Sequence, residues 1–157
     1  MPPCSTSVSK QIRKVAVLGA GTMGSRIAAH IANAGLPVIL LDIVPPGTDA
    51  GADKAAKNKF VLAAIEGLKK SKPAAFYTPE SARLITVGNF EDDLGLITDC
   101  DWVIEVVAEN LEIKHALLAK VVQHRRVDSI LTTNTSGLPI AKIAGGVDRR
   151  ASCRDRV

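Results

Sequence analysis

A glycine cluster between two apolar runs constrains the fold of this chain more than any other feature. The run Val15–Leu18 has the length and β-branched content of a buried strand, and Gly19–Gly24 (GAGTMG) follows it directly. Small and apolar residues at helical spacing come next and stop at a Gly-Leu-Pro segment. A second apolar run, Val38–Leu41, then ends on Asp42. This order predicts a strand, a tight turn, a helix and a second strand.

The positions in the glycine cluster are those that a bound dinucleotide requires. Gly19 allows the tight turn out of the strand, Gly21 lets the backbone approach a pyrophosphate, and Gly24 lets the helix pack closely on the sheet. The free N–H groups of the first helical turn favour phosphate charge. The other predicted cofactor-binding residues of the loop are Ala20, Thr22 and Met23.

Asp42 indicates which dinucleotide is bound. It follows the last glycine at close to the spacing of roughly 20 residues at which an acid accepts hydrogen bonds from an adenosine ribose. A carboxylate there would repel a 2′-phosphate, and no Arg or Lys occurs in Ile43–Asp49, so we predict NAD rather than NADP. A methyltransferase that binds a nucleoside remains an alternative, as does a glycine-rich turn in another α/β protein.

Composition and alternation of elements predict the fold class. The chain has 157 residues, of which 46% are hydrophobic but only 3% aromatic, so its core must be aliphatic, as in a parallel sheet covered by helices. We predict an α/β fold, a Rossmann-type doubly wound parallel sheet with three αβα layers. Residues 1–11 are expected to be a disordered leader, 12–144 the NAD-binding domain and 145–157 an irregular tail.

Several other classes of protein are disfavoured. No apolar run approaches a membrane span, and the first residues do not resemble a signal peptide. The three cysteines show neither metal-ligand spacing nor a disulfide framework, so we expect a cytoplasmic protein without a metal site. The net charge of +4 lacks interleaved aromatics, which favours solvated faces over nucleic-acid binding and leaves an anionic small ligand as the second interpretation.

The rest of the chain alternates between helical and strand patterns. We expect a helix within Ala50–Lys70, a strand at Leu84–Val87, a short helix at Phe90–Thr98, a strand at Trp102–Val107, a helix at Leu111–Val122, a strand at Ile130–Thr133 and a helix from Pro139. The candidate buried positions of the first of these helices are Phe60, Leu62, Ile65 and Leu68. Polar residues follow the last two strands, at Ala108–Asn110 and Asn134–Ser136. In a parallel sheet these positions lie at the ligand-binding edge.

The segments VAVLGAGTMG, VILLD, WVIEVVAENLEIK and TTNTSGLPI together resemble the NAD-binding domain of 3-hydroxyacyl-CoA dehydrogenases. The similarity extends from about Ile12 to Ile143. It implies that Asp42 holds the adenosine ribose and that Glu109 and Lys114 lie along the nicotinamide half of NAD. It also implies that Ser136 contacts nicotinamide and the reacting oxygen of an L-3-hydroxyacyl-CoA, whose oxidation in fatty-acid β-oxidation gives a 3-oxoacyl-CoA.

The sequence departs from the family pattern after Ala144. The family places a catalytic histidine in a G-x-H-F-F-N-P strand, whereas this chain reads GGVDRRASCRDRV. His30, His115 and His124 belong to or flank predicted helices and do not replace that histidine. We therefore expect a C-terminally truncated chain that lacks the catalytic histidine and the helical domain and is inactive alone.

Three functional hypotheses remain. The first is a 3-hydroxyacyl-CoA dehydrogenase with an acyl-CoA substrate, and the second is a non-catalytic NAD-binding module or fragment that needs a partner chain. The third is a different dehydrogenase with a similar β-α-β start, such as one acting on sugar acids. Without further strands, Ile130–Thr133 would be an exposed sheet edge, which predicts self-association, for instance as a homodimer.

Overall fold

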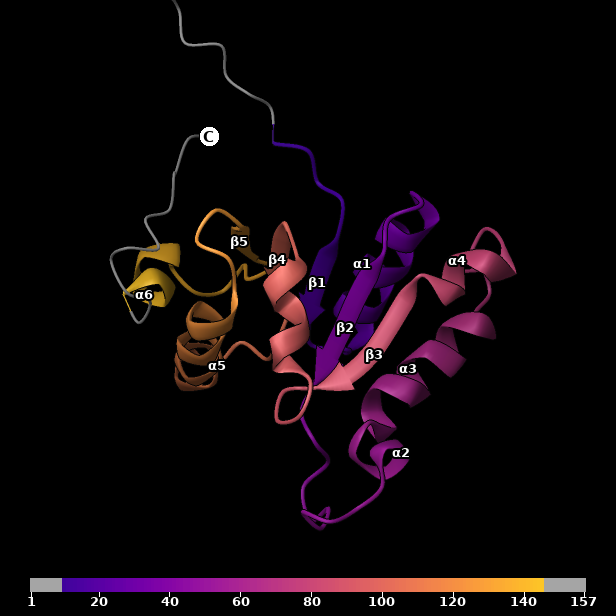
Figure 1. The fold of residues 1–157 in the computed structure, drawn as a ribbon, viewed down its shortest axis with the longest axis horizontal. Helices are drawn as coiled ribbons and strands as arrows, with labels where there is room; N and C mark the ends of the chain where they lie inside the picture. The colour runs from indigo at the N-terminus through magenta and orange to yellow at the C-terminus, as the bar shows by residue number, and fades with distance from the viewer. Residues whose placement is uncertain (1–9, 146–157) are drawn as a thin grey trace, which may run out of the picture.

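The computed structural model describes residues 10–145, so most of the predicted leader and tail lies outside the described residues. Five strands form one parallel sheet in the order β3-β2-β1-β4-β5, which is the strand order of a Rossmann fold (Figure 1). The strands are β1 (Val15–Leu18), β2 (Val38–Asp42), β3 (Ile85–Asn89), β4 (Trp102–Glu105) and β5 (Ile130–Thr133). The prediction of a Rossmann-type parallel sheet is confirmed.

Helices cover both faces of this sheet. They are α1 (Thr22–Asn33), α2 (Lys54–Lys57), α3 (Lys59–Lys69), α4 (Pro79–Arg83), the 3₁₀ helix η1 (Leu94–Asp99), α5 (Leu111–His124) and α6 (Ile140–Ala144). One hydrophobic cluster joins Val15 and Val17 of β1 to α1 and α3, and the other joins Ala16 and Leu18 to η1 and α5. Alternate residues of one strand therefore face different helices, and the three-layer αβα arrangement follows.

The burial of the central strand β1 explains why its sequence is apolar without interruption. All four residues of β1 are fully buried, since both of its faces are covered and both of its edges are paired. Val15 lies opposite Val38 of β2 and Trp102 of β4 in a parallel register. This register brings the carboxyl ends of β1, β2 and β4 to the same edge of the sheet.

The predicted helix within Ala50–Lys70 is divided in two, because Asn58 lies between α2 and α3. The Asn58 side chain is buried, and its Oδ1 accepts a hydrogen bond of 2.8 Å from Nδ2 of Asn89 at the end of β3. The expectation that Phe60 and Leu62 are buried is wrong, since they are 42% and 39% exposed. Helix α3 instead buries Val61, Ile65 and Leu68, which share one helical face.

The predicted helix over Phe90–Thr98 begins later, as the 3₁₀ helix η1. Oδ1 of Asn89 accepts hydrogen bonds from the backbone N–H groups of Glu91 (2.9 Å) and Asp92 (2.8 Å). This side-chain turn holds the segment after β3 in a non-helical conformation. Strand β3 correspondingly continues to Asn89, two residues past its predicted end.

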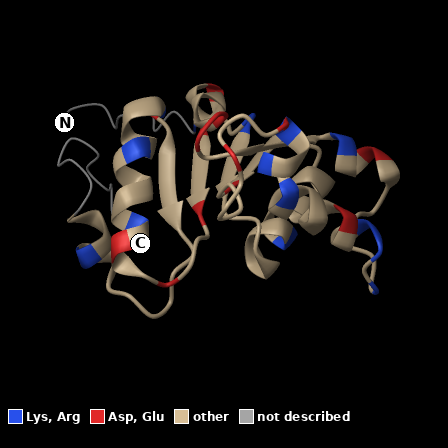
Figure 2. Ribbon diagram, turned by 90° about the horizontal axis from the view of Figure 1, so that it is seen from below, with Lys and Arg blue, Asp and Glu red and all other residues tan. Residues whose placement is uncertain are grey.

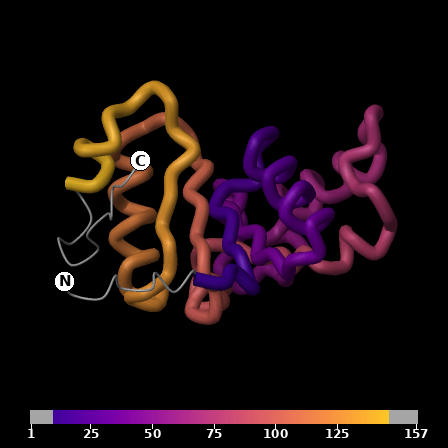
Figure 3. The backbone as a smooth tube through the Cα atoms, turned by 90° about the horizontal axis from the view of Figure 1, so that it is seen from above, coloured from indigo at the N-terminus to yellow at the C-terminus, as the bar shows by residue number. Residues whose placement is uncertain are grey.

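Strand β5 is an edge strand of the sheet formed by the described residues. Figure 3 shows β5 and α5 at the opposite end from α1 and α3. Within residues 10–145, β5 pairs only with β4, and Ile130 is exposed. No helix in the same residues is both long and apolar enough to cross a membrane.

Candidate functional site

The turn out of β1 has a conformation and a packing that require glycine. Gly19 has φ +111°, and a β-carbon there would overlap the carbonyl oxygen of Val106, just after β4. A β-carbon on Gly24 would overlap the carbonyl of Gly19 itself. The glycine loop is therefore pressed against the chain that leaves β4.

Gly21 is a different case, since nothing lies within 4 Å of a β-carbon built on it. It is the N-cap of α1 and offers no side-chain hydrogen bond to the first-turn N–H groups. These N–H groups and the positive end of the 12-residue helix are suited to an anionic ligand. The space above Gly21 is open to such a ligand.

Asp42 lies beside the glycine loop. Its Oδ2 accepts a hydrogen bond of 2.8 Å from the backbone N–H of Ala20, and its Oδ1 accepts one of 2.7 Å from that of Ile43. These two bonds fix the carboxylate at the end of β2. The structure thus brings together the two sequence features on which the prediction of NAD rests.

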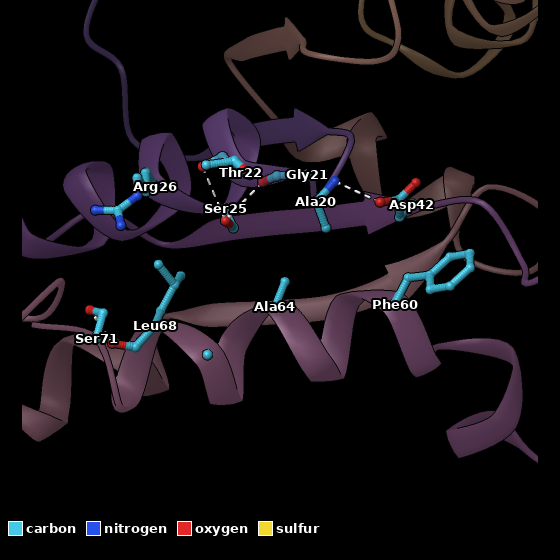
Figure 4. Close-up of a pocket in the computed structure, with 11 residues that line it drawn as sticks. Ala20, Gly21, Thr22, Ser25, Arg26, Asp42, Phe60, Ala64, Leu68 and Ser71 are labelled. Carbon is cyan, nitrogen blue, oxygen red and sulfur yellow. Dashed lines mark hydrogen bonds between the residues drawn. The ribbon is translucent and has the colours of Figure 1, made fainter.

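A hollow of about 480 Å³ runs from Asp42 and the glycine loop into the groove between α1 and α3 (Figure 4). Figure 4 shows Phe60 near the Asp42 end and Arg26 and Ser71 at the opposite end. Arg26, Phe60 and Ser71 are not among the site residues predicted from the sequence. Phe60 is exposed beside Asp42, the predicted ribose-binding acid, which marks it as a residue of the hollow. The helical pattern of the sequence alone had placed Phe60 in the core.

A second group of predicted residues meets at the ends of β4 and β5. Oε1 of Glu109 lies 3.3 Å from the backbone nitrogen of Ser136 and 3.4 Å from its Oγ, so the loop after β5 donates to a carboxylate of the loop after β4. Both residues are exposed. The prediction that these two polar segments share one edge of the sheet agrees with the structure.

Lys114 is buried in the fold, whereas Glu109 and Ser136 are exposed. Its side chain is 1% exposed, and Nζ donates to Oε1 of Glu105 at 2.7 Å and to the carbonyl oxygen of Val107 at 3.2 Å. These two hydrogen bonds hold the Lys114 ammonium inside the fold. The sequence analysis did not identify Glu105 as its partner.

Two histidines and a cysteine of the described residues have surroundings of their own. His115 forms a hydrogen bond of 2.8 Å with the carbonyl oxygen of Lys142, and His30 is exposed on α1. Burial raises the pKa of the Cys100 thiol to about 11, so it stays protonated at neutral pH. Residues 10–145 contain no cluster of three or more His, Cys, Asp or Glu residues that could hold a metal ion.

The lysines of α2 and α3 are largely neutralised. Lys54 pairs with Asp93 at 3.1 Å, Lys57 with Asp92 at 3.0 Å and Lys69 with Glu66 at 2.8 Å. Figure 2 shows basic and acidic residues interspersed at both ends of the molecule. This distribution favours solvated faces, as the composition had indicated.

Comparison with known proteins points to one family. Residues 14–154 match the family model described as "3-hydroxyacyl-CoA dehydrogenase, NAD binding domain". A probable 3-hydroxyacyl-CoA dehydrogenase of Bacillus subtilis is 44% identical over 145 residues, which are 87% of this chain and 18% of that protein. A protein of Rickettsia felis named as a fatty acid oxidation complex trifunctional enzyme is 46% identical, with the same two coverages.

A solved structure shares the fold. The 3-hydroxybutyryl-CoA dehydrogenase of Escherichia coli K12 superposes with a TM-score of 0.68 at 28% sequence identity, over 90% of this chain and 28% of that one. The chain thus spans less than a third of the length of each of these three proteins.

Proposed function

Because the chain belongs to the family of 3-hydroxyacyl-CoA dehydrogenase NAD-binding domains, we propose that it is the coenzyme-binding part of an enzyme that oxidises L-3-hydroxyacyl-CoA. The product is the 3-oxoacyl-CoA, and the pathway is fatty-acid β-oxidation. The observation that carries this proposal is the open glycine loop beside a fixed Asp42 carboxylate. The name of the Rickettsia relative supports the assignment to fatty-acid oxidation.

The family's coenzyme is NAD, and the described residues fit it. The first-turn N–H groups of α1 would bind the pyrophosphate above Gly21, where no atom blocks its approach. Asp42 would accept hydrogen bonds from the adenosine ribose hydroxyls. When bound there, NAD would supply the acceptor for the hydride that leaves C3 of the hydroxyacyl substrate.

The nicotinamide end is assigned to the second group of residues. We place Glu109 along the nicotinamide half, and Ser136 at nicotinamide and the reacting oxygen of the substrate. Lys114, predicted to lie along the same half, is 1% exposed and donates to Glu105, so we assign it to supporting this end from inside the fold. The 3.3–3.4 Å contacts between Glu109 and Ser136 support this, because they hold two loops of the ligand-binding edge together.

The acid–base half of the reaction needs a further group. All three histidines of the sequence precede the Asn134–Ser136 turn, whereas the family pattern places the catalytic histidine after it. We propose that this histidine comes from another domain or from a partner chain. The small share of each relative that the chain covers supports this arrangement.

The cysteine pattern favours a cytoplasmic location.

A fluorescence titration of the chain with NADH tests the coenzyme assignment. We expect saturable binding of NADH, weaker binding of NADPH, and a loss of NADH affinity of roughly tenfold in Asp42→Ala, as for one charged hydrogen-bonding group. A folded chain that binds neither nucleotide would contradict the proposal.

The second candidate is an NAD-binding module without catalysis of its own, favoured by the match of residues 14–154 to an NAD-binding domain. Oxidation of NADH by acetoacetyl-CoA distinguishes the two when it is measured with and without the histidine-bearing domain of a relative. Turnover only after that domain is added supports the coenzyme-binding part of a dehydrogenase, whereas tight NADH binding without turnover in either case supports the module. Turnover by the chain alone would contradict both candidates.

A further inference from the structure

Glu105 is a buried acid to which neither the family resemblance nor the proposed function assigns a role. It ends β4, and its side chain is fully buried. Every other residue of that strand is hydrophobic. A buried carboxylate is costly unless it is paired and hydrogen-bonded, so its partners indicate why it is there.

Both carboxylate oxygens of Glu105 have partners. Oε1 accepts from the backbone N–H of Val107 at 2.8 Å and from Nζ of Lys114 at 2.7 Å. Oε2 accepts from Oγ1 of Thr133 at 2.6 Å. The backbone carbonyl of Glu105 accepts from the N–H of Asn134 at 2.8 Å. One residue thus holds the chain after β4, the first turns of α5 and the chain after β5.

These three anchored segments carry the polar residues of the nicotinamide end. Val107 is two residues before Glu109, Thr133 directly precedes the Asn134–Ser136 turn, and Asn134 begins it. Lys114 closes a ring by donating also to the carbonyl oxygen of Val107 at 3.2 Å. The contact between Glu109 and Ser136 lies at the exposed end of this buried network.

We propose that Glu105 is a positioning residue, which sets the relative placement of the two loops that receive the nicotinamide end of NAD. The proposal rests on the proposed function, since it assumes that NAD binds at this edge. Glu105 itself is fully buried, so it acts through Val107, Lys114 and Thr133 rather than by touching the coenzyme. A residue needed only to fill the core would be better served by a hydrophobic side chain, which needs no hydrogen-bond partners.

Two ligands separate positioning from simple stability. NADH uses both ends of the site, whereas ADP contains the adenosine and pyrophosphate but neither the nicotinamide nor its ribose. Affinities of the 157-residue chain for both are measured by titration calorimetry on Thr133→Val, Thr133→Ser and Glu105→Gln. The variant Thr133→Ser keeps the hydroxyl that donates to Glu105 and is the matched control.

We expect Thr133→Val to lower NADH affinity about tenfold while ADP affinity changes by less than about twofold, the size of effect of one charge-assisted hydrogen bond. Thr133→Ser should retain the wild-type ratio of the two affinities. Glu105→Gln should shift the ratio in the same direction as Thr133→Val.

Equal loss of NADH and ADP affinity in Thr133→Val, or no loss of either, overturns the positioning role. If Glu105→Gln fails to fold, the two Thr133 variants still decide the question. Failure of the unsubstituted chain to bind either ligand would instead contradict the proposed function, so the two failures are distinguishable.

Discussion

The two ends of the candidate coenzyme site are built in opposite ways. At the glycine loop, the chain leaves open space at Gly21, and the first-turn N–H groups of α1 have no side-chain cap. At the ends of β4 and β5, the buried ion pair of Glu105 with Lys114 and the hydroxyl of Thr133 anchor the two loops to the interior of the fold. The first end depends on steric fit of the backbone, and the second depends on satisfied charges. Substitutions at the two ends should therefore fail in different ways.

The largest expected effect is at the charged end. Lys114→Met leaves the Glu105 carboxylate buried without its ammonium partner, so we expect a loss of roughly 3–5 kcal/mol in the free energy of unfolding. Urea unfolding measures it. The double variant Glu105→Leu with Lys114→Met removes both charges and should recover most of the loss. If Lys114→Met were as stable as the parent chain, the Glu105 carboxylate would not need its ammonium partner, which would contradict this prediction.

The next effect is at the glycine loop. In Gly24→Ala the added β-carbon overlaps the Gly19 carbonyl, so we expect a loss of roughly 3 kcal/mol, since backbone must move. The matched control is Gly21→Ala, where the β-carbon meets nothing within 4 Å.

Gly21→Ala should unfold at nearly the same urea concentration as the parent chain, yet bind NADH about tenfold more weakly, because its methyl group enters the pyrophosphate space. Equal stability losses in the two alanine variants would contradict this division between a glycine needed for packing and one needed for the ligand.

The smallest expected effect concerns the opposite end of β4. Asp101 Oδ2 accepts from the backbone N–H of Arg13 at 2.9 Å, and Oδ1 accepts from Arg126 at 2.7 Å. These hydrogen bonds hold the pKa of the Asp101 carboxyl below its usual value. Its stabilising contribution is therefore present above the unfolded-state pKa of about 3.9 and is lost as pH falls through the lower folded-state pKa.

We expect Asp101→Asn to lower the free energy of unfolding by roughly 1 kcal/mol at pH 7, and the difference from the parent chain to shrink below about pH 4. Asp99→Asn is the control, since that exposed acid makes only a 3.9 Å ion pair with Lys14. Because this cluster lies away from the nicotinamide end, Asp101→Asn should not alter the ratio of NADH to ADP affinity. A difference that persists unchanged at pH 3 would contradict the titration of Asp101.

The sequence predicted the glycine-loop end well because its signals are local. The strand, the loop and Asp42 occur at fixed spacing, and the apolar run of β1 reflects burial on both faces. The segment WVIEVVAENLEIK pointed to Lys114 but not to its partners, because Glu105, Lys114 and Thr133 lie on a strand, a helix and a second strand that meet only in the fold. The break at Asn58 was missed for the same reason, because its partner Asn89 lies on a distant strand. Phe60 and Leu62 were misplaced because the buried face of α3 follows Val61 instead.

The contact of Gly19 with the Val106 carbonyl has a practical consequence for coenzyme engineering. Val106 lies between Glu105 and Val107, so the glycine turn after β1 packs directly on the segment that the charged network anchors. Its backbone N–H also donates to the carbonyl oxygen of Leu18 at 2.8 Å, which ties that segment to β1. A redesign of the proposed nicotinamide end that displaces residue 106 would change the shape of the glycine loop as well. Libraries that aim to change cofactor preference should therefore vary both loops together rather than one at a time.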